Sequence, residues 1–225
     1  MKSENKMSDT VYFNSRDQYV QWKINKQMLD LIRSVKKVYT EISIVCIGTD
    51  RSTGDSFGPL TGHMLSQLML LDFSLYGTLE CPVHALSLPK LMEELSTEQS
   101  LIIAVDAGVG DLGMVGSLGL GYGPVRPGSG LGKSLPSIGD ISVTGIVAMG
   151  GLAPFIMLQN APLGLVYNMA EKAFFAIQYA LRALQLEKKV QMRSETRGHL
   201  LHSVKPATAV SLNGDLLSAY KGQIG

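Results

Sequence analysis

Two aspartates, Asp55 and Asp106, stand where a carboxylate could do chemistry. Asp55 lies in a polar loop after the short apolar run 42–47, and Asp106 directly follows the apolar run 101–105. A carboxylate beside a buried strand is costly unless it is hydrogen-bonded or protonated. Two such groups brought close together do not both ionise readily, so one can serve as a general acid while the other activates water. The pair predicts acid–base hydrolysis.

Helix capping is the competing interpretation of these aspartates. Asp55 precedes an expected helix that starts near Phe57, and on spacing alone a cap is favoured there over a catalytic group. Asp106 precedes a dipeptide that does not begin a helix, so capping explains it less well. Asp50 either shares the site or holds a turn, and the turn is favoured. Thr49 and Asp50 are retained as candidate substrate contacts.

Two glycine-rich segments approach nucleotide-binding motifs without meeting their requirements. Residues 108–113 fit G-x-G-x-x-G, but that motif must open a helix and the residues that follow are strand-like. Residues 127–134 come close to a P-loop, but Pro127 replaces the first glycine and Pro136 would spoil the helix. We therefore expect no nucleotide cofactor. The backbone is instead expected to approach a substrate chain closely at Gly128, Ser129 and Gly130.

The histidines and cysteines predict no metal site and no disulfide framework. His199 and His202 have H-x-x-H spacing near the C-terminus, which is weak evidence for a metal. His84 follows an expected strand and could reach the site, although a hydrogen-bonded loop histidine is favoured. His63 is interpreted as structural. Two cysteines are too few for a disulfide framework, and Cys46 lies in an apolar run as a small buried hydrophobe.

Alternating strands and helices must position these groups. Apolar, β-branched runs predict strands at 42–47, 76–81, 101–105, 115–120 and 141–149. Apolar residues spaced by three or four predict helices at 24–35, 60–71, 88–95 and 163–184, the last with Asn160 as its N-cap. This alternation predicts an α/β fold with a doubly wound, mostly parallel sheet and helices on both faces. Functional groups in such sheets gather beyond the carboxyl ends of the strands.

Length and composition are those of a globular protein. The chain has 225 residues, of which 45% are hydrophobic and 17% charged. We expect one α/β domain over 1–225, with a core at about 24–186, a polar N-terminal segment and a mildly basic tail at 187–225. The tail is interpreted as a solvated extension rather than a substrate-steering arm.

A net charge of +1 gives no electrostatic footprint for nucleic acid or a membrane. Because no signal peptide or membrane-spanning segment is visible, we expect a cytoplasmic location.

Several motifs resemble one known family. Residues 48–59, GTDRSTGDSFGP, resemble the signature of the YyaC-type sporulation proteins of spore-forming Firmicutes, as do residues 76–85 and 127–136. The resemblance covers roughly 40–180 and keeps its order throughout. That family is itself similar to the germination protease, which degrades small acid-soluble spore proteins. The fold that the resemblance implies is the phosphorylase/hydrolase-like architecture, which the hydrogenase-maturation endopeptidases share.

The resemblance implies a spore endopeptidase of the aspartic type. Its catalytic pair would be Asp55, in DSFGP, and Asp106, in VDA, with the backbone amides of Gly128 to Gly130 holding the peptide or its oxyanion. The implied partner is a protein or peptide substrate, with small acid-soluble spore proteins as candidates, and the implied location extends to the forespore or spore core. The maturation endopeptidases use a carboxylate pair plus a histidine around a metal, and no histidine of this chain matches that ligand convincingly, so no metal is expected. Two alternative functions stay open, namely a metal-dependent peptidase and a non-catalytic spore-assembly protein. Association into a homo-oligomer is also left open.

Overall fold

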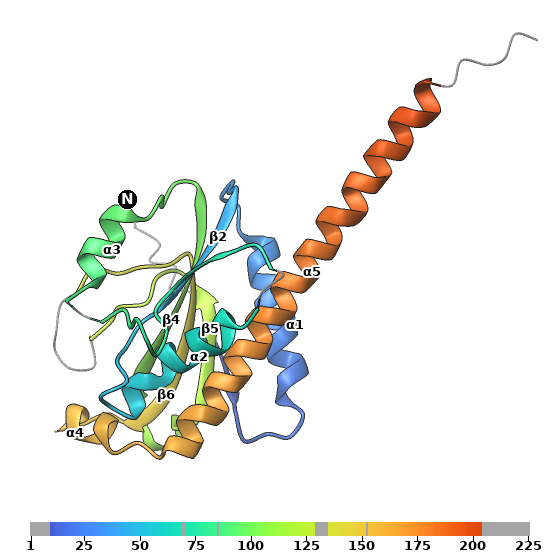
Figure 1. Cartoon of the computed structure of the whole chain (residues 1–225). Helices are drawn as coiled ribbons and strands as arrows, with labels where there is room; N and C mark the ends of the chain where they lie inside the picture. The colour runs from blue at the N-terminus through green and yellow to red at the C-terminus, as the bar shows by residue number, and fades with distance from the viewer. Residues whose placement is uncertain (1–9, 69–70, 85, 129–134, 152, 204–225) are drawn as a thin grey trace, which may run out of the picture. The chain divides into compact units, whose positions relative to one another are not determined.

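Six strands form one sheet in the computed structural model, which describes residues 10–68, 71–84, 86–128, 135–151 and 153–203, with side chains as far as Gln191 (Figure 1). The strand order across the sheet is β1-β5-β6-β4-β2-β3. The strand bounds are β1 Val11–Asn14, β2 Glu41–Cys46, β3 Ser74–Tyr76, β4 Ser100–Gly110, β5 Ser117–Tyr122 and β6 Ile141–Met149.

Strand directions make the sheet mostly parallel. Strands β3, β2, β4 and β6 run parallel to one another, whereas β5 is antiparallel to both β6 and β1. The described helices are α1 Val20–Ser34, α2 Phe57–Ser66, α3 Leu88–Glu94, α4 Pro154–Gln159 and α5 Leu163–Ser203, with short 3₁₀ turns η1 Gly54–Ser56 and η2 Leu112–Met114. The predicted α/β class with a mostly parallel sheet is confirmed.

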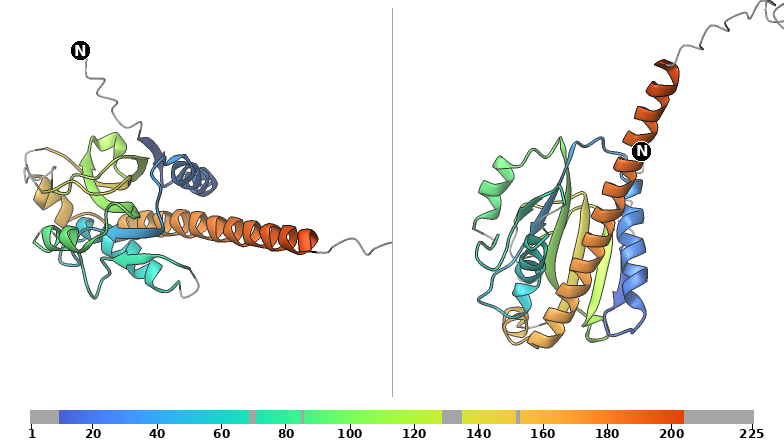
Figure 2. Two further views of the ribbon diagram at one scale, coloured as in Figure 1. Left: turned by 90° about the horizontal axis from the view of Figure 1, so that it is seen from above. Right: turned by 45° about the vertical axis from the view of Figure 1, so that its right-hand side comes forward.

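Two apolar cores lie on opposite faces of this sheet. The larger core packs α1, α2 and the first part of α5 on alternate residues of β2, β4, β5 and β6, such as Ile44, Ile103 and Val143 (Figure 2). The smaller core packs α3 on the other face, against residues of β2 and β4 such as Val45 and Ile102. This alternation follows from the two-residue period of a strand. The prediction of helices on both faces is therefore confirmed, and more helices pack on the face of the larger core than on the other face.

The structure differs from the sequence prediction mainly at short or peripheral elements. Strand β1 lies in the polar N-terminal segment that was expected to fall outside the core, and it forms because it pairs with β5, from Val11 opposite Leu120 to Asn14 opposite Ser117. Strand β3 is shorter and earlier than the expected 76–81, and α4 was not predicted. Asn160 is not an N-cap of the long helix, because it is the C-cap residue of α4 and its side-chain amide donates to Ile156 O at 2.8 Å.

The chain divides into two compact units, Met1–Gln185 and Leu186–Gly225. The first contains the whole sheet and helices α1 to α4. Helix α5 continues to Ser203, so helical structure extends well into the segment from 187 that was expected to be a solvated tail. Within the described residues, no helix combines the length and apolar character that crossing a membrane requires.

Candidate functional site

Asp55 is held by a tightly packed loop after β2. Gly48 has a φ of +143°, and a Cβ there would lie 1.9 Å from the carbonyl oxygen of Asp55. A Cβ at Gly58 would lie 2.1 Å from the oxygen of Ile47, so both glycines allow the chain to fold back closely on the end of β2. The N–H of Thr49 donates to Asp55 O at 3.1 Å and closes the loop. Local backbone packing therefore determines where the Asp55 side chain stands.

Helix capping does not account for Asp55. Turn η1 has Thr53 as its N-cap residue, and α2, which follows directly, has Ser56. Neither cap position is Asp55, and neither makes a side-chain capping hydrogen bond. The carboxyl group of Asp55 instead lines a pocket, where its exposure is intermediate.

Asp106 lies inside β4, not beyond its end. The strand continues to Gly110, five residues further than the expected 101–105. The neighbouring strand β2 ends at this level, because Cys46 pairs with Val105 and the N–H of Ile47 donates to Val105 O at 2.7 Å. Asp106 therefore stands where one of its two flanking strands has stopped, and only β6 continues beside it, with Thr144 opposite.

The floor of the site is a row of residues that crosses the sheet on the face opposite the large core. In sheet register, Asp106 on β4 is opposite Thr144 on β6, Thr144 is opposite Gly119 on β5, and Gly119 is opposite Tyr12 on β1. A Cβ at Gly119 would lie 2.7 Å from the Tyr12 ring. The missing side chain therefore lets Tyr12 fold over the sheet and form one wall of the hollow.

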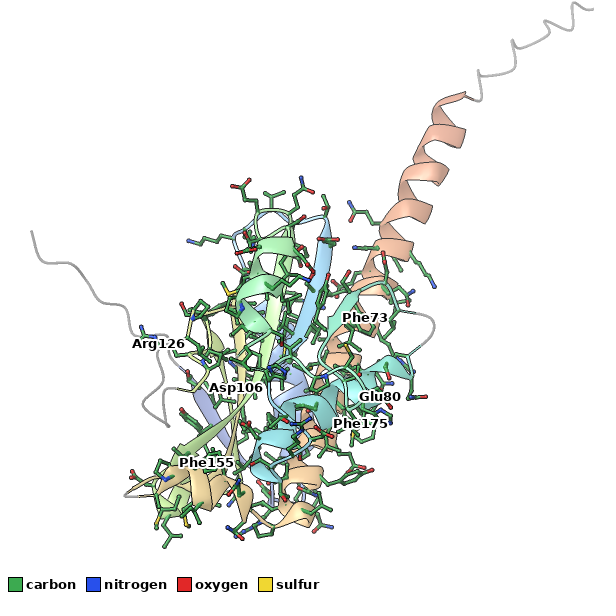
Figure 3. All side chains as sticks on the ribbon, turned by 60° about the vertical axis from the view of Figure 1, so that its left-hand side comes forward. Phe73, Glu80, Asp106, Arg126, Phe155 and Phe175 are labelled. Atoms are coloured by element: carbon green, nitrogen blue, oxygen red, sulfur yellow. The ribbon has the colours of Figure 1, made fainter. Side chains whose placement is uncertain are left out.

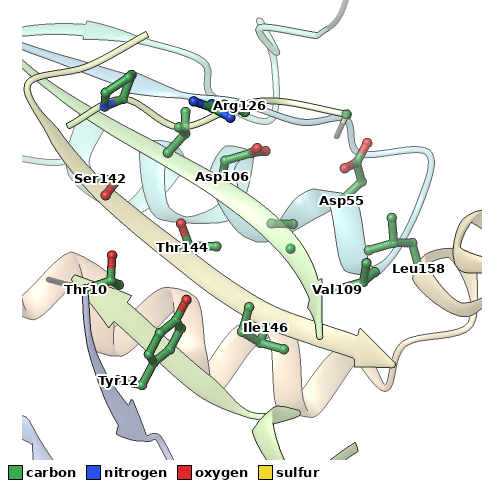
Figure 4. A pocket seen from close by; sticks show the side chains of 15 residues that line it. Thr10, Tyr12, Asp55, Asp106, Val109, Arg126, Ser142, Thr144, Ile146 and Leu158 are labelled. Atoms are coloured by element: carbon green, nitrogen blue, oxygen red, sulfur yellow. The ribbon is translucent and has the colours of Figure 1, made fainter. Parts of the chain in front are cut away.

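This row opens into a pocket of about 330 Å³, which we call the Asp pocket (Figure 4). Both carboxyl groups extend into it, Asp106 from β4 and Asp55 from η1. Its lining residues are Thr10, Tyr12, Asp55, Asp106, Ala107, Gly108, Val109, Pro124, Val125, Arg126, Gly128, Ser142, Thr144, Ile146 and Leu158. The carboxylates thus share one solvent-accessible hollow with hydroxyl groups and a cation.

The two carboxylates interact electrostatically. Burial and, after it, the negative charge of Asp55 raise the pKa of Asp106 from 3.8 to about 8, against the lowering effect of the Ala107 N–H that donates to it. Asp106 is 8% exposed, and among the described residues no basic side chain forms an ion pair with it. At neutral pH Asp106 therefore holds its proton, and the pKa of Asp106 depends in part on the charge of Asp55.

Arg126 is a pocket residue that the sequence analysis did not identify. It is exposed on the segment after β5 (Figure 3), and it lines the same pocket as Asp106 (Figure 4). Thr144, Ser142 and Tyr12 were missed as well. These residues could have been predicted from the alternation of large apolar residues with Gly, Ser or Thr in β5 and β6. Such alternation indicates that one face of the strand is not covered by a helix.

The other predicted site residues fall in different places. Gly128 lines the Asp pocket with a φ of +71°, whereas Ser129 and Gly130 lie outside the described residues. Thr49 and Asp50 occupy the turn after β2 and do not line the pocket; the N–H of Arg51 donates to Thr49 Oγ1 at 3.3 Å.

The histidines described by the structure are engaged in local contacts. His84 Nδ1 accepts from the Leu86 N–H at 3.2 Å, and His63 Nδ1 lies 3.2 Å from a carboxylate oxygen of Glu80. The side chains of His199 and His202 are outside the described part. Among the described side chains, no three His, Cys, Asp or Glu residues gather into a metal-binding group. Cys46 is fully buried, as predicted, and burial raises the pKa of its thiol.

Comparison with known proteins identifies relatives. The chain is 47% identical over 131 residues to "Uncharacterized protein YyaC" of Bacillus subtilis (strain 168), and this alignment covers 57% of the chain and 64% of that protein. The aligned part therefore spans less than two thirds of the relative's length. Residues 12–175 match the family described as "Protein of unknown function (DUF1256)", a range that contains both aspartates and most of the Asp pocket. The chain belongs to the DUF1256 family.

Proposed function

We propose that this protein is a peptidase of the aspartic type that acts on a protein or peptide in the spore-forming cell. The observation that carries the proposal is the placement of Asp55 and Asp106 in one pocket, where Asp106 is buried and Asp55 is partly exposed. Two carboxylates in unequal environments divide the roles of acid and base between them. The resemblance of DSFGP and VDA to the germination protease supports the same pair.

The unequal environments assign the roles. Asp106, with its raised pKa, carries the proton that passes to the peptide carbonyl oxygen. The Asp55 carboxylate accepts a proton from the water that attacks the carbonyl carbon. The tetrahedral intermediate then collapses, its C–N bond breaks, and the proton held by Asp55 passes to the leaving amine while Asp106 recovers its own. Both carboxyl groups thereby return to their starting states.

Other lining groups suit a peptide. The N–H of Gly128 is a candidate donor to the developing oxyanion, and the Arg126 guanidinium adds positive charge to the same pocket. Gly108 and Thr144 have no large side chains, which leaves room above the sheet for an extended main chain at these two positions. Small acid-soluble spore proteins are the candidate substrates, and the cytoplasm of the forespore is the candidate location.

The proposal is tested by cleavage assays with mass spectrometry on a purified small acid-soluble spore protein and on an unbiased peptide mixture. We expect Asp106→Asn and Asp55→Asn each to reduce cleavage at least about 100-fold, because each removes one proton-transfer group. The matched control is Asp111→Asn, which removes an exposed carboxylate just beyond β4 that does not line the pocket. Cleavage should also fall above about pH 8, where Asp106 loses its proton.

Three outcomes would contradict this assignment. Full activity in either pocket variant would remove the carboxylate mechanism. Activity that chelators abolish and zinc restores would favour the metal-dependent alternative. No cleavage by the wild-type protein across pH, with or without metal, while the same peptides still bind, would favour a non-catalytic binding protein.

A further inference from the structure

Strand β4 loses its neighbour on one side at the Asp pocket. The Ile47 N–H donates to Val105 O at 2.7 Å, and directly afterwards the chain turns away from β4 at Gly48, where φ is +143°. Strand β4 continues past this point. Its residues Ser100 to Asp106 are buried, whereas residues 107–110 are half-exposed. The last part of β4 is therefore a sheet edge that opens within the fold.

The backbone groups of β4 point alternately toward its two neighbours. The carbonyl of Val105 points toward β2, where it accepts from Ile47, whereas the carbonyl of Gly110 points the other way and accepts from the N–H of Gly150, just after β6, at 2.9 Å. Residues separated by two in a strand direct their N–H and C=O groups to the same side. The backbone groups of Ala107 and Val109 therefore point, like those of Val105, toward the side that β2 has left.

Two of these backbone groups lack a partner within the described part of the chain. The register of β2 on β4 ends with Cys46 opposite Val105, so β2 offers nothing to the Ala107 C=O or the Val109 N–H. No hydrogen bond from a described loop or side chain reaches either group. The Ala107 N–H differs, because it donates to the Asp106 carboxyl group. An acceptor and a donor thus stand free, as they do at the open edge of a sheet.

This edge borders both carboxyl groups of the site. Residues 107–109 line the Asp pocket together with Asp106 and Asp55. Asp55 stands on the side of β4 that β2 has left, because its carbonyl oxygen would lie only 1.9 Å from a Cβ at Gly48 (Figure 4). A chain that paired with the edge would therefore run between β4 and the loop of Asp55, past the carboxyl group of Asp106.

We propose that an extended segment of the substrate pairs with β4 at residues 107–109 as an added strand, in the position that β2 leaves. The inference rests on the proposed peptidase function and adds how that site holds the main chain of its substrate. The Val109 N–H donates to a carbonyl of the substrate, and the Ala107 C=O accepts from a substrate N–H. The main chain then lies beside β4, and the space above Gly108 takes a side chain of the substrate.

Strand addition of this kind makes specific demands on the substrate. The hydrogen bonds come from the main chain, so the bound segment must be extended and must keep its N–H at the position that faces Ala107. The next N–H on either side along the segment points away from β4. A substrate that lacks one amide hydrogen is therefore affected at one position and not at the two positions that flank it.

An N-methyl scan of a synthetic peptide tests this pairing on the full chain. The peptide spans a cleavage site found with the peptide mixture above, and its amides near that site are methylated one at a time. We expect KM to rise about 3- to 10-fold at the position that donates to Ala107, which is the effect of losing one hydrogen bond. Methylation at the two flanking positions should leave KM within about 2-fold of the parent peptide.

Replacing the donor on the protein gives a matched result. Val109→Pro deletes the N–H that faces the substrate, and proline is tolerated at a strand edge because no ladder bond is lost there. We expect KM to rise about 3- to 10-fold. The control is Asp111→Pro, outside the Asp pocket, where a φ of −66° already suits proline; it should keep the wild-type KM.

Amide hydrogen exchange gives a readout that does not depend on the proline variant folding. In Asp106→Asn, we expect the Val109 N–H to exchange rapidly without peptide and at least about 10-fold more slowly with saturating parent peptide, since a hydrogen-bonded amide is protected. The Gly108 N–H, which points toward β6, should exchange slowly in both states.

The outcomes separate this inference from the proposed function. Cleavage by the wild type with no difference between methylated positions, or with Val109 unprotected by peptide, would overturn strand addition and leave the peptidase assignment standing. If the wild type binds peptides without cleaving them, the same scan on Kd tests the pairing, and the peptidase assignment alone falls. A protein that neither cleaves nor binds any peptide of the mixture would remove both.

Discussion

The two faces of the same sheet contrast sharply in composition. On β4, the residues that face the large core are apolar and fully buried, as at Leu101, Ile103 and Val105. On the opposite face the same strand changes from apolar residues to Asp106 and then Gly108. Strand β6 repeats this contrast, with valines toward the helices and Ser142 and Thr144 toward the pocket. A single set of strands thus serves both stability and the site.

Unequal helix cover explains the contrast. Helices α1, α2 and α5 pack on one face, whereas α3 packs on the other only against β2 and β4. The remainder of the second face, over β6, β5 and β1, is left with small residues and becomes the Asp pocket. Asp106 is therefore buried at the edge of this pocket beside a second carboxylate, and no described cation forms an ion pair with it.

Another carboxylate shows what Asp106 lacks. Asp140 precedes β6, and its Oδ2 accepts from Lys37 Nζ at 2.9 Å and from the Ile102 N–H at 2.9 Å. Its carboxylate oxygen thus has a cation and a backbone donor as partners. Asp106 has the Ala107 N–H but a second carboxylate in place of the cation. We interpret Asp140 as a structural carboxylate and Asp106 as a functional one.

Replacing the ionisable carboxyl group of Asp106 should have the largest effect on this contrast. Its pKa is raised in the native state, so between about pH 4 and 8 the native protein binds a proton that the unfolded chain does not, and stability falls as pH rises. Asp106→Asn lacks this slope. Relative to the wild type, we expect its free energy of unfolding to increase by on the order of 4–5 kcal/mol from pH 4 to 8.

Urea unfolding at several pH values measures this difference. Asp111→Asn, beyond the pocket, is the control and should follow the wild-type pH dependence. Parallel pH profiles for the wild type and Asp106→Asn would contradict the raised pKa.

The contrast also predicts that truncating a side chain lowers the free energy of unfolding more on the core face of the sheet than on the pocket face. Ile103→Ala empties a fully buried position in the large core and is expected to cost about 3–4 kcal/mol. Thr144→Ala, on the adjacent strand but facing the pocket, should cost less than about 1 kcal/mol because the site is only half-buried. Denaturant unfolding of both variants at one pH gives the comparison. Equal losses in the free energy of unfolding for the two variants would mean that the pocket face is packed as tightly as the core.

Elements with strong local patterns were predictable. The apolar run 141–149 coincides with β6, and the run 42–47 differs from β2 by one residue at each end. The carboxylate pair was reached from the rule that parallel strands present their carboxyl ends at one edge, together with the family resemblance. Such features depend on short-range periodicity, which a sequence displays directly.

The remaining features depend on contacts between distant residues. Strand β1 has four residues and is stabilised by pairing with β5, more than a hundred residues away, so its own composition gave little signal. Helix α4 has six residues, too few for a clear period. Arg126 follows no motif and enters the site only because the segment after β5 folds beside β4. The length of β4 likewise depends on β6 continuing beside it.

The most direct test of the account is the titration of the Asp106 carboxyl carbon by ¹³C NMR, in the wild type and in Asp55→Asn. We predict that this carbon titrates near pH 8 in the wild type. Since the Asp55 charge contributes to that value, we also predict a lower pKa for Asp106 in Asp55→Asn. A wild-type pKa near 4, or one that Asp55→Asn leaves unchanged, would contradict a coupled pair of carboxylates in this pocket.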